Sequence, residues 1–87
     1  MNFYVTTSFE KKAKKLIKKD SQLRLILTKQ FDLFQKNPQH PSLKLHKLQG
    51  KRSQQYSIWI KDNLRAISIK SEDGAYVFFD FITHDQY

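Results

Sequence analysis

Hydrophobic residues recur with helical spacing in the first half of the chain. A short β-prone run at residues 2–6 comes first and predicts a strand. Apolar residues then follow one stripe that starts at Phe9 and a longer stripe that starts at Leu23, both with the spacing of three and four residues typical of an α-helix. The joint at Asp20-Ser21 is short, and Asn37-Pro38 disfavours further helix, so we expect the two helices to form an antiparallel hairpin.

The second half of the chain alternates between apolar and polar residues, which is typical of strands. Three such runs separated by turn residues predict an antiparallel meander. The runs lie at 56–60, 64–70 and 75–84, with a possible short strand before them at 43–48. In the last run, strict alternation places Val77, Phe79 and Phe81 on one face of the sheet.

Together these elements have the order β-α-α-β-β-β. They predict an α+β fold of two layers, an antiparallel sheet with an N-terminal helical hairpin packed on one face. The other face of the sheet lacks a helix to cover it, which makes it a natural binding surface. At 87 residues the chain is expected to form a single domain, residues 1–87.

Composition narrows the class of protein. Aromatic residues make up 14% of the chain, which is enough for a small core, and the lack of cysteine excludes disulfides, thiolate zinc sites and a cysteine nucleophile. No apolar run reaches the roughly 20 residues of a membrane span, and no segment resembles a signal peptide. We therefore expect a cytoplasmic protein with no membrane partner.

The chain is strongly basic, with 16 Lys and Arg against eight Asp and Glu and a formal charge of +8. This charge favours a polyanionic partner, either a nucleic acid or an acidic protein; the narrow apolar stripe of the first helix argues against a membrane surface. All six lysines of that helix are expected on the arc opposite the stripe. The candidates for docking on an RNA backbone are Lys11, Lys14, Lys15 and Lys18, and the alternative is a solvated face. Leu25 lies off the stripe of the second helix and is a candidate contact for a protein partner.

Three short motifs stand in a fixed order along the chain. They are Leu45-His46-Lys47-Leu48-Gln49-Gly50, Leu64-Arg65 and the closing Thr83-His84-Asp85. With the opening strand and the lysine-rich hairpin, this order resembles the RelE/ParE superfamily of bacterial toxins, the toxin halves of type II toxin–antitoxin pairs. The resemblance covers essentially the whole chain. It implies a RelE/ParE-like fold and a cognate acidic antitoxin as the obligate partner.

The resemblance also implies one of two activities. RelE-like and YafQ-like members cleave mRNA, usually inside the translating ribosome and without a metal or other cofactor, whereas ParE-like members inhibit DNA gyrase and cleave nothing. The closing Thr83-His84-Asp85 looks more like the YafQ-type branch, while Trp59 departs from it because YafQ-type toxins carry a histidine there. The leading hypothesis is a ribosome-dependent mRNA endoribonuclease that inhibits translation. The alternatives are a ParE-like gyrase inhibitor and a non-toxic RNA-binding member.

Metal-free cleavage of RNA needs a base for the 2′-hydroxyl proton, a cation for the crowded phosphate and an acid for the leaving 5′-oxygen. The resemblance assigns proton transfer to His84 and His46, and the neighbouring Lys47 favours the neutral imidazole that a base requires. Arg65 is the only arginine in the predicted sheet and needs an anionic partner. That partner is either a substrate phosphate or an internal acid such as Asp80, and we favour the phosphate.

Further residues are candidates for holding RNA. Cations near Gly50 suit the phosphate backbone, and aromatic rings can stack on an unpaired base. This set comprises Lys47, Lys51, Arg52, Trp59 and Tyr87. Tyr56 is a further candidate for stacking, but its side chain and that of Trp59 project to opposite faces, so at most one of them lies on the substrate side. The alternatives are a solvated turn for the cations and a core position for either ring.

Overall fold

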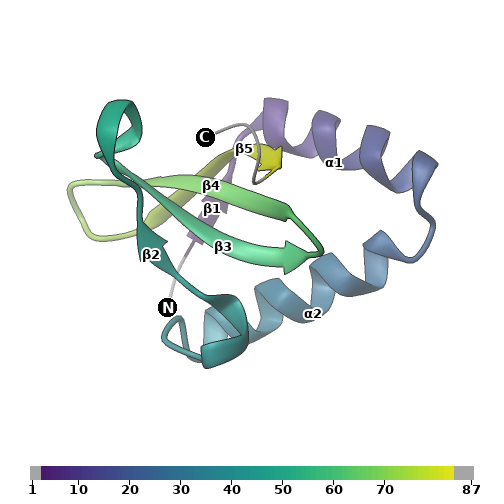
Figure 1. The fold of residues 1–87 in the computed structure, drawn as a ribbon, viewed down its shortest axis with the longest axis horizontal. Helices are drawn as coiled ribbons and strands as arrows, with labels where there is room; N and C mark the ends of the chain where they lie inside the picture. The colour runs from purple at the N-terminus through teal and green to yellow at the C-terminus, as the bar shows by residue number, and fades with distance from the viewer. Residues whose placement is uncertain (1–2, 84–87) are drawn as a thin grey trace.

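The structure is a computed structural model that describes residues 3–83 of the chain. Two helices form a hairpin beside a five-stranded sheet (Figure 1). The elements are β1 (Phe3–Val5), α1 (Thr7–Lys19), α2 (Leu23–Lys36), the 3-10 helix η1 (Pro41–Leu43), β2 (His46–Lys47), the 3-10 helix η2 (Gly50–Arg52), β3 (Gln55–Lys61), β4 (Leu64–Lys70) and β5 (Tyr76–Thr83). The predictions for His84 and Tyr87 lie outside the described residues. No helix in the described part of the chain is long and apolar enough to cross a membrane.

The strands have the order β1-β5-β4-β3-β2 across the sheet. Strands β3, β4 and β5 pair antiparallel, as the meander predicts, and β2 adds an antiparallel edge to β3. Strand β1 instead runs parallel to β5, so the sheet is mixed rather than wholly antiparallel. Two parallel strands cannot be joined by a tight turn and need a long connection. Here the connection from β1 to β5 contains the helical hairpin and the other three strands. Strand β2 is shorter than the expected 43–48 because Pro41–Leu43 forms η1.

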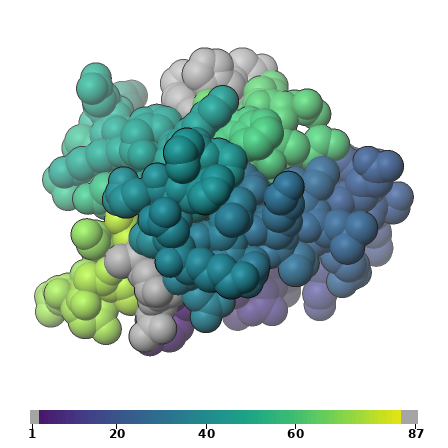
Figure 2. All heavy atoms as spheres, turned by 90° about the horizontal axis from the view of Figure 1, so that it is seen from below, coloured from purple at the N-terminus to yellow at the C-terminus, as the bar shows by residue number. Residues whose placement is uncertain are grey.

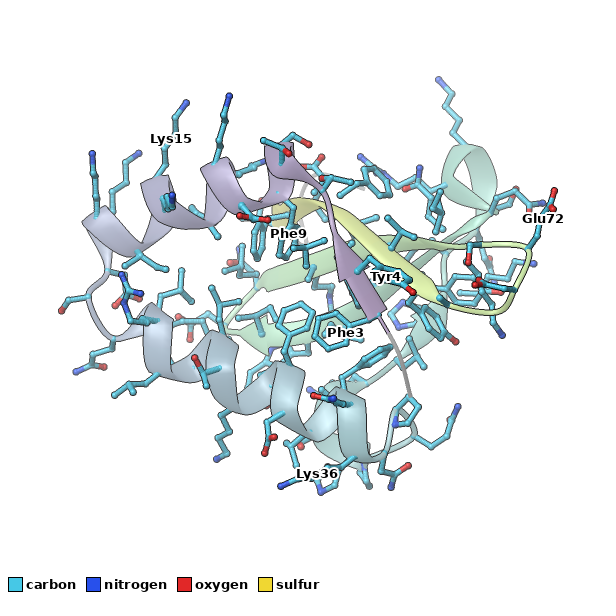
Figure 3. The ribbon with its side chains drawn as sticks, turned by 180° about the vertical axis from the view of Figure 1, so that it is seen from behind. Phe3, Tyr4, Phe9, Lys15, Lys36 and Glu72 are labelled. Carbon is cyan, nitrogen blue, oxygen red and sulfur yellow. The ribbon has the colours of Figure 1, made fainter. Side chains whose placement is uncertain are left out.

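The helices pack on one face of the sheet through aromatic and aliphatic side chains. Helix α1 begins after Thr6, whose side-chain oxygen accepts a hydrogen bond from the backbone N–H of Phe9 at 3.1 Å. The ring of Phe9 stacks on Phe81 of β5 with centroids 4.3 Å apart, and Phe34 of α2 is fully buried against Phe78. Figure 3 shows Phe9 pointing toward the sheet. The core therefore lies between the hairpin and the meander, as the apolar stripes predict.

A β-bulge in β5 changes which side chains face the helices. Ile67 of β4 pairs with Asp80 and the next residue of β4 pairs with Phe78, which leaves Phe79 as an extra residue. Beyond this bulge Phe81 joins Phe78 in the core, whereas Phe79 packs on the opposite face. The expectation of a common face for Val77, Phe79 and Phe81 is therefore wrong, because strict alternation stops at the bulge.

Lys12 of α1 is bound at the same bulge. Its ammonium lies 2.7 Å from the Asp80 carboxylate and also donates to the carbonyl of Phe81 at 2.9 Å. Lys12 is therefore an exposed lysine of α1 that is paired with an acid, with 47% of its side chain still open to solvent. Asp80 is also no longer a free internal partner for Arg65, because its carboxylate is already paired.

Candidate functional site

The sheet face turned away from the helices, called the open face below, carries the candidate residues. Side chains that are direct cross-strand partners share a face of a sheet. The register pairs Trp59 of β3 with Arg65 of β4, and Arg65 with Ile82 of β5. Ser57, two residues before Trp59 on β3 and therefore on the same face, pairs with His46 of β2. Two of the predicted catalytic residues, His46 and Arg65, are thereby placed on the same face.

Leu48 covers part of the open face. It packs with Ile67, Ile82 and Phe79 in a small second cluster on this side of the sheet. Leu48 reaches this position because its backbone N–H donates to the carbonyl of Gln55 at 2.9 Å and continues the pairing of β2 with β3. The open face is therefore apolar at its centre, and the polar candidates stand around this cluster.

His46 is exposed and oriented by the backbone. Its Nδ1 lies 3.0 Å from the carbonyl oxygen of Lys44. Because a carbonyl can only accept, Nδ1 carries the proton, and in the neutral ring Nε2 is left with its lone pair. Lys44 holds a left-handed conformation with φ of +50° directly after η1, and Ser42 of η1 donates its backbone N–H to Nδ1 of His40 at 3.2 Å. The turn at Lys44 thus orients the imidazole of His46, with Nε2 directed away from this backbone contact.

Arg65 has no anionic partner among residues 3–83. Its Nε and Nη1 are buried and have no hydrogen-bond partner among the described residues. Leaving a buried N–H of a charged group unpaired is costly, so such groups are normally satisfied by a partner. Asp80, the internal acid considered from the sequence, is paired with Lys12 instead. Two nitrogens of the guanidinium are therefore left without an anion among the described residues.

Trp59 is fixed in position on the open face, and Tyr56 is not on it. Nε1 of Trp59 donates to the carbonyl of Asp62 at 2.8 Å, and the carbonyl of Trp59 accepts from Nε2 of the buried Gln30 at 2.8 Å. The ammonium of Lys44 lies 5.2 Å from the centroid of the indole ring. Tyr56 packs against Tyr76 in the core. Of the two rings considered for stacking, Trp59 is therefore the one on the open face.

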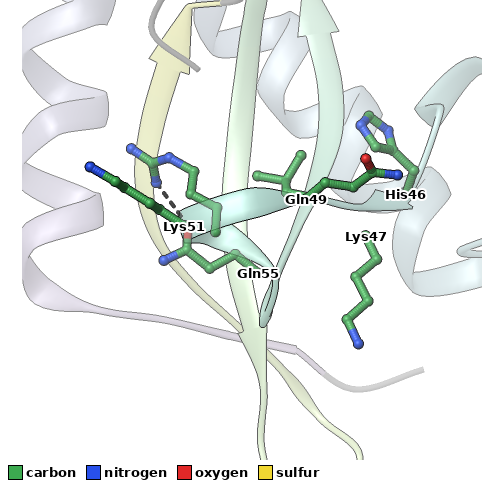
Figure 4. Close-up of a pocket in the computed structure, with 7 residues that line it drawn as sticks. His46, Lys47, Gln49, Lys51 and Gln55 are labelled. Carbon is green, nitrogen blue, oxygen red and sulfur yellow. Dashed lines mark hydrogen bonds between the residues drawn. The ribbon is translucent and has the colours of Figure 1, made fainter.

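An open hollow of about 970 Å³ lies beside these residues (Figure 4). It is lined by His46, Lys47, Leu48, Gln49, Lys51, Arg52 and Gln55. Nη1 of Arg52 donates to the side-chain oxygen of Gln55 at 2.8 Å, which fixes the guanidinium at the edge of the hollow. The structure thus brings together three predicted RNA-binding cations and His46, and none of the described residues that line the hollow is acidic.

The lysines of α1 form a separate surface. Lys11, Lys14, Lys15 and Lys18 are exposed and pair with no acidic side chain in residues 3–83. Figure 3 shows Lys15 pointing away from the body of the protein. None of them lines the hollow, so these predicted RNA contacts belong to a different part of the surface.

Sequence reasoning missed two residues of the site, Lys44 and Gln30. Lys44 could not be distinguished from the other lysines of its loop, because its contacts depend on the turn that follows η1. Gln30 did carry a signal in the sequence, since it is a polar residue three and four residues after Leu27 and Ile26, on the apolar stripe of the second helix. In the structure it is only 4% exposed. It bridges the carbonyls of Trp59 and Ser42 and so connects α2 to both sides of the site. Figure 2 shows the segment after α2 at the middle of the lower face, between α2 and the β4–β5 turn.

Comparisons with known proteins rest on structure. No family model and no curated protein matches the sequence. YafQ from E. coli strain BL21(DE3) aligns with a TM-score of 0.73 at 18% identity, over 98% of this chain and 94% of YafQ. The YoeB/ParE toxin from Agrobacterium tumefaciens aligns with a TM-score of 0.73 at 14% identity, over 97% of this chain and 99% of the toxin. This chain has the RelE/ParE fold.

A third neighbour extends the RelE/ParE likeness to another organism. The conserved hypothetical protein HP0894 from Helicobacter pylori aligns with a TM-score of 0.64 at 26% identity, over 98% of this chain and 96% of HP0894. YafQ has also been solved with DinJ as a toxin–antitoxin complex. Proteins with this RelE/ParE fold therefore include toxins that are bound by an antitoxin.

Proposed function

We propose that this chain is the toxin of a type II toxin–antitoxin pair and acts as a metal-independent mRNA endoribonuclease on the translating ribosome, in the cytoplasm. The observation that carries this proposal is the guanidinium of Arg65, which lies on the same face as His46 and has two buried nitrogens without a partner among residues 3–83. The strand register puts the Cα atoms of these residues roughly 12 Å apart, a span that the two side chains can close around one phosphate. Structural neighbours that are toxins support the toxin role.

In this proposal, cleavage starts at the 2′-hydroxyl next to the scissile phosphate. Nε2 of His46 takes the hydroxyl proton, and the 2′-oxygen attacks phosphorus while the bond to the 5′-oxygen breaks. Arg65 binds two phosphate oxygens and stabilises their added charge in the transition state. The leaving 5′-oxygen takes its proton from His84, the acid that the sequence suggests. The products are a 2′,3′-cyclic phosphate and a 5′-hydroxyl.

The remaining cations bind RNA without choosing its sequence. Lys47, Lys51 and Arg52 line the hollow and hold the backbone of the mRNA. The exposed lysines of α1 dock on ribosomal RNA, so binding weakens as salt rises. An acidic antitoxin competes for the same positive surfaces, and the 75% exposed Leu25 of α2 offers it an apolar contact.

The test is primer extension on an mRNA that is being translated when the chain is expressed. We expect cuts with the wild type and at least a tenfold loss with His46→Ala, with His84→Ala and with Arg65→Ala. Arg65→Lys keeps the charge but removes the planar fork, so it should also lose most of the activity. Arg24→Lys is the matched control, because Arg24 is an exposed arginine on α2, which packs on the opposite face of the sheet.

Two outcomes contradict the proposal. Unchanged cuts in the His46→Ala, His84→Ala double variant remove both histidines from the chemistry. Growth arrest with DNA damage signalling and intact mRNA points to the ParE-like alternative, inhibition of gyrase. Circular dichroism of each purified variant separates lost chemistry from lost folding.

A further inference from the structure

The indole ring of Trp59 on the open face has one cation over it and an arginine as its cross-strand neighbour. The ammonium of Lys44 is 5.2 Å from the centroid of the ring. Arg65, two of whose nitrogens have no partner among residues 3–83, is the cross-strand partner of Trp59. We propose that Trp59, Lys44 and Arg65 form a subsite for one unpaired nucleobase and its phosphate. The base stacks on the indole in the place of the Lys44 ammonium, which moves to the phosphate. This inference rests on the proposed function, because it takes single-stranded RNA as the ligand.

The indole is held ready for stacking. Its Nε1 donates to the carbonyl of Asp62 at 2.8 Å, and its own backbone carbonyl is held by Gln30 at 2.8 Å. Because the ring is oriented before the ligand arrives, stacking costs little additional side-chain entropy. A half-buried ring held in this way is a suitable platform for a base, since every base offers a planar π-face.

Lys44, by contrast, can leave the ring. It is exposed, and no acidic side chain within residues 3–83 pairs with its ammonium. The contact of an exposed lysine with an aromatic face is weaker than the stacking of a base on that face. A phosphate that arrives with the base also attracts the ammonium of Lys44. The indole then gains a stacked base, and the ammonium gains a phosphate.

The combination of groups favours a nucleotide over an acidic peptide. A carboxylate could pair with Arg65 but would gain nothing from the indole. A nucleotide places a planar ring and an anion next to each other, which is the arrangement of Trp59 beside Arg65. The chain also contains a built-in comparison: Lys70 lies 5.3 Å from the ring of Tyr76, but that ring is only 5% exposed and no base can reach it.

Fluorescence tests the subsite directly, because Trp59 is the only tryptophan of the chain. The full chain is titrated with a 2′-O-methyl RNA hexanucleotide, which cannot be cleaved because it lacks the free 2′-hydroxyl, and with an abasic oligonucleotide of the same length. We expect saturable quenching with the first and no quenching with the second. Fluorescence anisotropy of labelled hexanucleotide then measures the affinity of each variant.

Trp59→Ala should raise the Kd for the hexanucleotide roughly 5- to 150-fold, and Trp59→Phe, which keeps a ring, should raise it less. Lys44→Ala should lower the slope of log Kd against log salt by about 0.7, as expected for one lost phosphate contact. Lys70→Ala is the matched control and should change neither the Kd nor the slope.

Equal affinity for the two oligonucleotides, with unchanged tryptophan emission, would show that the base does not stack on Trp59. Wild-type affinity in both Trp59 variants would lead to the same conclusion. Either result overturns the subsite and leaves the proposed cleavage of mRNA standing, since that depends on primer extension. Failure to bind either oligonucleotide also overturns the subsite. The proposed function is overturned as well only if the primer-extension test finds the mRNA intact.

Discussion

Replacing Gln30 with methionine isolates one buried hydrogen-bonding group on which the site depends. Gln30 is 4% exposed, and its Nε2 donates to the carbonyl of Trp59 at 2.8 Å and, more weakly, to that of Ser42 at 3.4 Å. Methionine has a similar shape and fills the space, so the loss of packing is small. The buried carbonyl of Trp59 loses its donor, which costs about 1–3 kcal/mol.

This cost is large for a domain of this size. Each 1 kcal/mol shifts the midpoint of thermal unfolding by about 4–8 °C in a domain of 60–100 residues, so we expect Gln30→Met to melt roughly 5–20 °C below the wild type. Urea unfolding, followed by the fluorescence of Trp59 and by circular dichroism, gives the free energy of unfolding. An unchanged slope with urea confirms that stability alone has changed.

Gln22→Met is the matched control. Gln22 precedes α2, is exposed and makes no capping hydrogen bond with its side chain, so its replacement should change the free energy of unfolding by less than about 0.5 kcal/mol. If Gln30→Met is as stable as Gln22→Met, the hydrogen bond between α2 and β3 contributes nothing net, and the reasoning from burial is refuted.

Three further predictions concern the loops and the surface. The hydrogen bond from Lys61 lowers the pKa of Asp20, so the ionised carboxylate stabilises the fold at a pH above its unfolded pKa. This stabilisation is lost as the pH falls below about 4, so melting curves from pH 3 to 7 should show a smaller acid-induced loss of stability in Asp20→Asn than in the wild type. Gly74 has φ of +88°, so Gly74→Ala should cost about 1 kcal/mol or more in a thermal melt, and an unchanged midpoint would contradict this. The pair Lys15→Ala and Lys18→Ala should lower the salt slope of RNA binding by about 1.4; an unchanged slope would remove α1 from the RNA surface.

The helices and the meander could be predicted because their signals are local. The stripes from Phe9 and Leu23 and the alternation from Leu64 to Lys70 depend on neighbouring residues along the chain, and the observed elements follow them. The parallel pairing of β1 with β5 could not be predicted in this way, since it joins Phe3 to Tyr76 across the whole chain. Pairings of that kind are decided by packing of the core and not by the residues of β1.

The candidate site was predicted in its composition but not in its arrangement. His46, Lys47, Lys51 and Arg52 do line one hollow, because they lie close together in the sequence and in one loop region. The partner of Arg65 could not be decided, because it depended on whether Asp80 was free. Only the packing of α1 beside β5 shows that Asp80 is bound to Lys12.

The bulge at Phe79 connects the core to the candidate site. Because of it, Phe81 points to the helices and stacks on Phe9, while Ile82 packs on the open face with Leu48. Without the extra residue, the last part of β5 would turn its phenylalanine to the open face and its isoleucine to the core. The sequence carried a sign of this, since apolar residues stand next to each other at both ends of the bulge and break the alternation. The pairing of Lys12 with Asp80 and the carbonyl of Phe81 therefore joins α1 to the segment of β5 in which the two faces exchange their side chains.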